Sequence, residues 1–156
     1  MMMGKGLLIS LTLLCLNVAI HAQNRLSTLP TVGVVTPLLD NGLGFQVGVN
    51  PSFKVNQYVS IESQFSYSYI NASAFLTGED EINNSFYALI GGRLYLASER
   101  KTFRPYINAM MGSSHSNKSG KNLGFSTGGF LQIGKTVVGI SLESTQNIVF
   151  KLGRRF

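Results

Sequence analysis

The chain has 156 residues, a formal net charge of +6 and only 13% charged residues. This length suits one domain, and the charged fraction is about half of the roughly 25% found in soluble domains. Hydrophobic residues make up 44% of the chain, which excludes intrinsic disorder because disordered chains combine low hydrophobicity with high net charge. The composition also disfavours a typical soluble enzyme, whose surface would carry more charge.

The first 22 residues predict a secretory signal peptide. Lys5 precedes an apolar run of 14 residues, 7–20, and the small residue Ala22 follows at a cleavage position. The run is shorter than the roughly 20 residues that a membrane-spanning helix needs. We therefore expect residues 1–22 to be removed and residues 23–156 to form one domain. Cys15 is the only cysteine, so the mature domain has neither disulfides nor thiolate chemistry.

Strict alternation of apolar and polar residues predicts β-strands, whereas no segment shows a capped helical period. The pattern is clearest over 58–70, where the apolar residues share one face and Ser, Glu and Gln residues share the other. Eight segments of about ten residues carry it: Leu29–Pro37, Leu43–Phe53, Tyr58–Ile70, Ser85–Ala97, Arg104–Ser113, Leu123–Gly134, Thr136–Thr145 and Ile148–Phe156.

The connections between these segments differ in length. The two longest are Asn71–Asn84 and Ser114–Asn122, whereas Lys54–Gln57, Ser98–Phe103 and Gly134–Lys135 are short. The two long connections fall on the same side of an up-and-down sheet. The sequence therefore predicts an eight-stranded antiparallel barrel with one end of long loops and one end of short turns.

Two kinds of barrel fit this pattern. A soluble, lipocalin-like secreted barrel turns its apolar face inward, whereas a transmembrane barrel turns it toward lipid. The polar faces here hold mostly Ser, Gly, Gln and Asn, although a water-facing strand would carry more Lys and Glu. Aromatic residues also gather near both strand ends, as in the interfacial belts of membrane barrels. We therefore expect a transmembrane β-barrel, with the soluble binding barrel as an alternative.

Further features point to a family. They are the leader ending at Ala22, the strand Arg104–Gly112 with its Pro-Tyr start, and a last strand that alternates Phe150, Leu152 and Phe156. With these features the chain resembles the small eight-stranded outer-membrane β-barrels, of the OmpX and OmpA transmembrane-domain type, of diderm bacteria.

The resemblance implies periplasmic termini in the cell outer membrane, with Asn71–Asn84 and Ser114–Asn122 extracellular. It also implies that the outer-membrane assembly machinery reads Phe150, Leu152 and Phe156 as its signal. The expected role is structural, adhesive or defensive, in a monomer without a wide pore. The fold itself does not decide between such roles.

Enzymatic catalysis is not expected. Lipid A deacylases of similar size use a His and a Ser two positions apart on a late strand, but the matching segment, 139–145, has no His. His115 lies among serines in a predicted loop, without the imidazole–hydroxyl–carboxylate arrangement that activates a nucleophile. We predict no catalytic residue, metal or cofactor. A lipid-modifying enzyme with an unrecognised site is the alternative.

The positive charge predicts lipid partners rather than nucleic acid. Lys118 and Lys121 lie in the third long-side connection, where lipopolysaccharide phosphates are the expected partners. Six other basic residues lie beside the short turns, where basic side chains reach phospholipid headgroups. They are Arg100, Lys101, Arg104, Lys135, Arg154 and Arg155.

The charged residues on the predicted polar faces include two pairs of opposite sign. If the hairpin between them closes near Ile70 and Ser85, Glu62 lies directly opposite Arg93. The same reasoning for the last hairpin, centred on Asn147, places Glu143 opposite Lys151. Because an unpaired buried charge is costly, the sequence predicts two ion pairs inside the barrel.

Overall fold

The computed structural model describes residues 25–38, 41–73, 80–144 and 147–156. The predicted signal peptide, residues 1–22, lies outside these described residues. Within them, no helix is long and apolar enough to cross a membrane.

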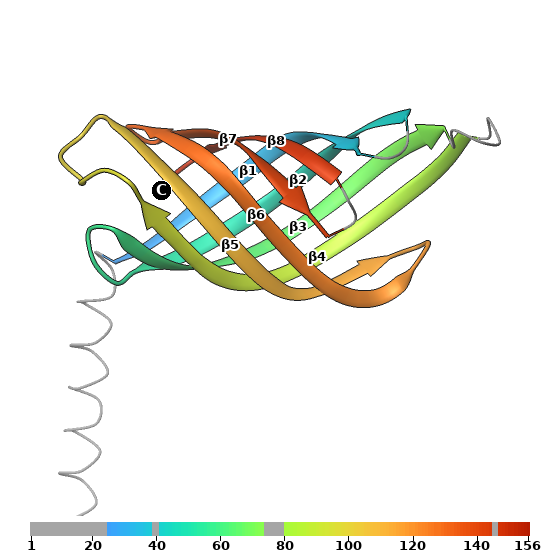
Figure 1. Cartoon of the computed structure of the whole chain (residues 1–156), viewed down its shortest axis with the longest axis horizontal. Helices are drawn as coiled ribbons and strands as arrows, with labels where there is room; N and C mark the ends of the chain where they lie inside the picture. The colour runs from blue at the N-terminus through green and yellow to red at the C-terminus, as the bar shows by residue number, and fades with distance from the viewer. Residues whose placement is uncertain (1–24, 39–40, 74–79, 145–146) are drawn as a thin grey trace, which may run out of the picture.

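Eight antiparallel strands close into one barrel in up-and-down order (Figure 1), as the sequence predicts. Each strand pairs with the next in the chain and the first pairs with the last, so the barrel has no open sheet edge. The strands are β1 (Leu26–Pro37), β2 (Asn41–Lys54), β3 (Val59–Ser73), β4 (Asp80–Tyr95), β5 (Phe103–Ser116), β6 (Gly120–Ile133), β7 (Thr136–Glu143) and β8 (Asn147–Arg154).

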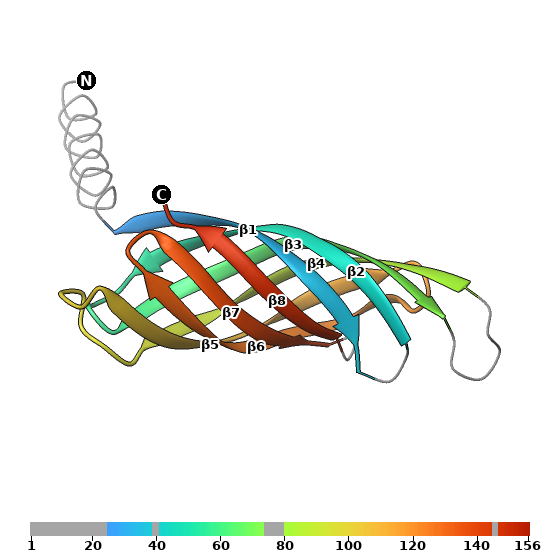
Figure 2. The ribbon, with the colours of Figure 1, turned by 90° about the horizontal axis from the view of Figure 1, so that it is seen from above.

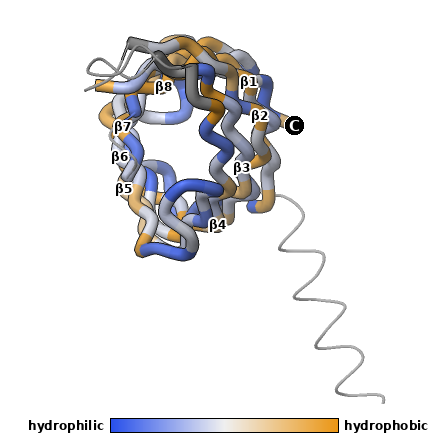
Figure 3. Tube along the Cα trace, turned by 90° about the vertical axis from the view of Figure 1, so that its right-hand side faces the viewer, coloured by the Kyte–Doolittle hydropathy of each residue, from blue (hydrophilic) through white to orange (hydrophobic). Residues whose placement is uncertain are grey.

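The barrel turns most of its polar side chains inward and its large apolar side chains outward. On β3, Glu62 and Gln64 are buried, whereas Ile61 and Phe65 are 49% and 45% exposed. Figure 3, which looks along the barrel, shows the closed ring of strands that separates the two faces. An apolar exterior around a polar interior is the arrangement of a barrel in lipid. The soluble-barrel alternative requires the reverse arrangement and does not fit this exterior.

Apolar side chains also fill parts of the interior. Phe130, on β6, faces Gly139 of β7 in the ladder, and a Cβ atom at position 139 would collide with the phenyl ring. Glycine at this position therefore gives the ring its space. The buried apolar side chains form three clusters, which are Leu29, Tyr95, Tyr106 and Val137 beside Phe130; Val35, Ile70 and Val149; and Tyr87, Leu89 and Met110.

The loop-end connections are shorter than the sequence predicts. β3 and β4 stay paired as far as Ser73 and Asp80, and β5 and β6 as far as Ser116 and Gly120. Most of Asn71–Asn84 and Ser114–Asn122 is therefore hairpin rather than loop. Their polar composition predicts loops, but a ladder of backbone hydrogen bonds does not need apolar side chains.

The first and last strands, β1 and β8, meet in a seam, where the start of β1 lies near the C-terminus of the chain (Figure 2). Beyond the β1–β8 ladder, Thr28 and Phe156 exchange backbone hydrogen bonds of 3.2 and 2.9 Å. The Phe156 side chain is 69% exposed. The backbone of Phe156 thus fastens the seam, while its ring lies on the outside.

Candidate functional site

In the half of the lumen nearest the short turns, polar side chains converge on Glu62. Arg93 donates two hydrogen bonds to its carboxylate, from Nη2 to Oε1 at 2.5 Å and from Nε to Oε2 at 3.1 Å. Asn50 Nδ2 donates to Oε1 at 3.0 Å, and Asn108 Nδ2 donates to Oε2 at 3.5 Å. We call these four residues the Glu62 cluster. One carboxylate thereby links β2, β3, β4 and β5 across the interior.

Aromatic rings enclose the Arg93 guanidinium. Its Cζ lies 4.5 Å from the Tyr106 ring centre and 5.7 Å from that of Tyr95, and Nη1 donates to Tyr95 Oη at 2.9 Å. Tyr106 in turn stacks on Phe130, with ring centres 5.0 Å apart. Because cation–π attraction is stronger away from water, these rings hold the buried charge in place.

Nearer the loop end, a second group converges on Glu143. Lys151 Nζ donates to Glu143 Oε1 at 2.8 Å and also to Gln64 Oε1 at 3.3 Å. Gln46 Nε2 donates to Glu143 Oε2 at 2.8 Å, and Gln64 Nε2 donates to Oε1 at 3.1 Å. These four residues form the Glu143 cluster, which links β2, β3, β7 and β8.

The structure brings Glu62 and Arg93 together at a register that differs from the predicted one. Glu62 lies opposite Gly91, and Arg93 lies opposite Ser60. The two charged residues are therefore diagonal neighbours, a separation that long side chains can bridge. The hairpin closes one residue earlier than the sequence suggests, because alternation predicts the face of a residue but not the offset between strands.

The register of the last hairpin also differs from the predicted one. Glu143 lies opposite Asn147, and Lys151 lies opposite Gly139. The Lys151 side chain spans this offset to reach Glu143. Strands that tilt around a barrel bring residues of different ladder positions to one height, so an ion pair does not require direct opposition.

The amide side chains that complete both clusters are not among the sequence-predicted site residues. Gln46, Asn50, Gln64 and Asn108 are each at most 5% exposed. The sequence signal for these residues is their position on the polar faces of alternating strands, which indicates that they point inward. Without the register, that signal does not indicate which carboxylate each amide meets.

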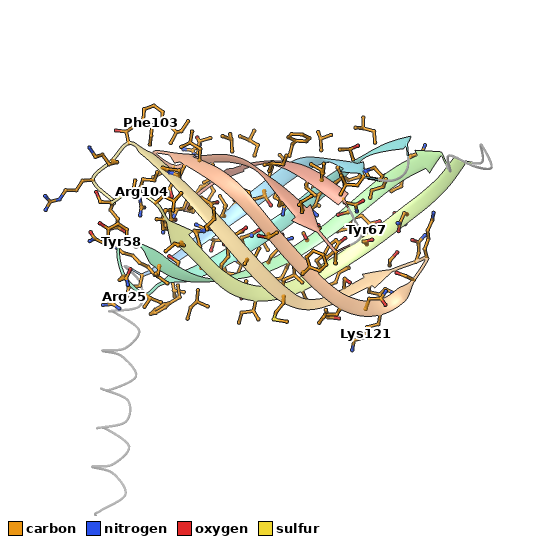
Figure 4. All side chains as sticks on the ribbon, in the orientation of Figure 1. Arg25, Tyr58, Tyr67, Phe103, Arg104 and Lys121 are labelled. Carbon is orange, nitrogen blue, oxygen red and sulfur yellow. The ribbon has the colours of Figure 1, made fainter. Side chains whose placement is uncertain are left out.

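Arg104 and Arg155 point toward the lumen rather than outward from the barrel wall. Arg104 is 5% exposed and alternates with the outward-facing Phe103, at the opposite end of the barrel from Lys121 (Figure 4). Arg155 is half-buried and donates from Nη1 to Tyr95 Oη at 3.1 Å. The other four basic residues of that predicted set are exposed, namely Arg100, Lys101, Lys135 and Arg154.

The three residues of the predicted assembly signal share the outer face of the barrel. Phe150, Leu152 and Phe156 are 53%, 51% and 69% exposed. Their side chains are therefore available to a lipid or a protein that approaches the β1–β8 seam from outside.

His115 lies on the outer face of β5 and is exposed, with Phe86 and Lys121 as its ladder neighbours. Within the described part of the chain, no three His, Cys, Asp or Glu side chains group together to hold a metal ion. The expectation that the protein lacks enzymatic activity and a metal stays a prediction.

Comparison with known proteins supports the fold. No family model and no curated protein matches the sequence. The outer membrane enzyme PagL is similar at 14% identity and a TM-score of 0.51, over 83% of this chain and 98% of that one. The Yersinia pestis outer membrane protein Ail matches at 14% identity and a TM-score of 0.49, over 85% and 99%. A de novo designed transmembrane β-barrel matches at 12% identity and a TM-score of 0.48, over 85% of this chain and 93% of that one. At these identities the likeness concerns the fold alone.

Proposed function

We propose that this protein is an integral outer-membrane β-barrel with a structural or surface-interaction role and without a wide pore. The observation that carries the proposal is the combination of an apolar exterior with a polar, hydrogen-bonded lumen. It fits the small barrels of the OmpX and OmpA transmembrane-domain type that the sequence resembles.

The exterior supports a lipid environment. Large exposed apolar side chains occur on all eight strands, from Val32 on β1 to Leu152 on β8. Soluble monomers rarely expose contiguous apolar patches of more than a few hundred Å². Each exposed Å² of apolar surface costs about 25 cal/mol in water, so a belt around the whole barrel is stable only in contact with lipid or detergent.

The side chains inside the lumen argue against a role in the bulk diffusion of solutes through the barrel. The Glu62 and Glu143 clusters draw side chains from six of the eight strands toward the interior. An eight-stranded barrel leaves an interior that is just wide enough for side chains to fill. These bonded side chains brace the wall, and they leave the surfaces of the barrel as the places where partners bind.

The orientation and partners are part of the same proposal. Short turns and both termini face the periplasm, and the hairpins that contain Asn71–Asn84 and Ser114–Asn122 reach the cell surface. The outward-facing Phe150, Leu152 and Phe156 are the features that the assembly machinery would read. Lys118 and Lys121, at the β5–β6 end, are suited to lipopolysaccharide phosphates.

Membrane fractionation of a diderm bacterium that expresses the full chain tests this proposal. We expect the protein in the outer-membrane fraction, with a gel mobility that changes on boiling because a folded barrel resists detergent. Recovery in the soluble periplasm would contradict the proposal. Mass spectrometry of lipid A with and without expression tests the non-enzymatic role, and a mass change that depends on the protein would favour the lipid-modifying alternative.

A further inference from the structure

A polar pocket opens at the short-turn end of the barrel, where the β4–β5 and β6–β7 turns meet. The two turns are joined by a hydrogen bond from Gly134 N to Thr102 O at 3.3 Å. The pocket has a volume of about 320 Å³, at the lower end of the roughly 300–1,000 Å³ of small-molecule sites. Its lining is Glu99, Arg100, Lys101, Thr102, Arg104, Gln132 and Gly134.

Arg104 supplies a buried cation to this pocket without a carboxylate partner among the described residues. Its Nη2 donates to the Gln57 carbonyl at 3.0 Å, and its Cζ lies 3.8 Å from the Tyr95 ring centre. Its Nε is buried and has no hydrogen-bond acceptor. A charged group in this state lacks the compensation that buried charges normally have.

Neighbouring groups reinforce the positive charge. Arg155, close by, bonds only to uncharged partners among the described residues: Ser27 Oγ, Tyr95 Oη and Gln132 Oε1. The one acidic residue of the lining, Glu99, forms an ion pair with Lys54 at 2.6 Å. In contrast, Arg93 and Lys151 each have their own carboxylate. The turn end therefore carries uncompensated cations that surround an open pocket.

We propose that this pocket binds a phosphate-type oxyanion, through the Arg104 guanidinium with Arg100 and Lys101 at its mouth. A guanidinium presents its N–H groups in a planar fork that fits two oxygens of a phosphate. The exposed Arg100 and Lys101 can close on the ligand from the turn. The phosphate belongs either to a lipid headgroup that reaches over the rim or to a soluble phosphate compound, and the chemistry of the site is the same in both cases.

Calorimetric titration of inorganic phosphate into the folded barrel tests this site. The protein is held in maltoside micelles, which contain no phosphorus, at about 0.15 M salt. We expect saturable binding by the unmodified protein. Arg104→Gln should weaken it about tenfold or more, because a charge-assisted hydrogen bond is lost. Lys135→Gln is the matched control, since it removes one charge from the same end but does not line the pocket. It should weaken binding about twofold at most.

An equal loss in both variants would overturn the site in favour of a diffuse positive field, and the absence of saturable binding would overturn it outright. If Arg104→Gln does not fold, the NMR signal of the Arg104 Nε–H group in the unmodified protein decides. This signal should shift in step with phosphate occupancy, and an unchanged signal at saturation would refute the assignment.

Phosphatidylglycerol added to the same micelles identifies the source of the ligand. Displacement of bound inorganic phosphate indicates a lipid headgroup, whereas phosphate binding that persists indicates a soluble phosphate compound. Either result supports the pocket. The site does not depend on the proposed surface role, so a failure of phosphate binding leaves the membrane assignment standing.

Discussion

The two carboxylates of the lumen are held in different ways. Glu62 accepts two hydrogen bonds from Arg93, whose guanidinium lies beside the rings of Tyr95 and Tyr106. Glu143 accepts a single hydrogen bond from Lys151 and further bonds from two glutamine amides. Arginine offers a rigid planar fork, and lysine a flexible point charge. The end nearest the short turns is therefore fixed by the geometry of the guanidinium fork, and the region toward the loops by a more adaptable network.

The largest expected effect is at Arg93. Arg93→Met leaves the Glu62 carboxylate buried without its cation and should destabilise the barrel by about 3–5 kcal/mol. Equilibrium unfolding in urea, with the protein in lipid vesicles, measures the loss. Leu94→Met, the next position of β4 but on the outer face, is the matched control and should stay within about 1.5 kcal/mol.

Combining Arg93→Ala with Glu62→Ala tests whether the pair is coupled. The double variant should lose less stability than the sum of the two single losses, because removing both charges leaves neither one unpaired. Strictly additive losses would mean that the two residues share a wet lumen without an energetic interaction.

Lys151→Met should have a smaller effect, of about 2 kcal/mol. It removes one charge-assisted hydrogen bond to the Glu143 carboxylate, whereas Arg93→Met removes two from Glu62. Each carboxylate keeps two amide donors. The same urea titration applies. A loss equal to or larger than that of Arg93→Met would erase the distinction between the two clusters.

A still smaller effect on stability, but a large one on assembly, is expected at the last residue. Phe156→Asp keeps the backbone bonds to Thr28 and changes only an exposed ring, so the unfolding free energy of the folded protein should change by about 0.5 kcal/mol or less. Pulse-chase measurement of outer-membrane insertion should nevertheless show a marked delay. Insertion at the unmodified rate would argue against the assembly-signal role of Phe150, Leu152 and Phe156.

The two ends of the barrel should differ in accessibility without any change in stability. An epitope tag placed within Asn71–Asn84 should react with antibody on intact cells, whereas the same tag within Ser98–Phe103 should react only after the outer membrane is opened. Labelling of the second tag on intact cells would invert the proposed orientation.

The sequence predicts the faces of the strands better than the contacts between them. Alternation over 58–70 places Glu62 and Ile61 on opposite faces, because side chains of a strand point to opposite faces in turn, and the uncharged composition of the polar faces predicts that Glu62 is the one inside. It does not give the strand offset, since register depends on where each hairpin turns. Both ion pairs therefore form at positions that differ from direct opposition.

Polar composition also predicts that the strands end earlier than they do at the loop end of the barrel. The segments beyond Ile70 and before Ser85 contain Asn, Ser and acidic residues, which favour turns, but the β3–β4 ladder continues through them. The place of Arg104 near a turn does not indicate the direction of its side chain, whereas its alternation with Phe103 is the signal for an inward side chain.

Methyl NMR of the unmodified protein in bilayer nanodiscs tests the central claim, that the apolar face meets lipid chains, most directly. With a spin label on the lipid tails, the methyl signals of the outward-facing Ile90 and Ile140 should broaden strongly, while those of the buried Val35, Val137 and Val149 should persist. A water-soluble relaxation agent should leave the first two unaffected. Equal broadening of both groups by the lipid label, or broadening of Ile90 and Ile140 by the soluble agent, would contradict the account.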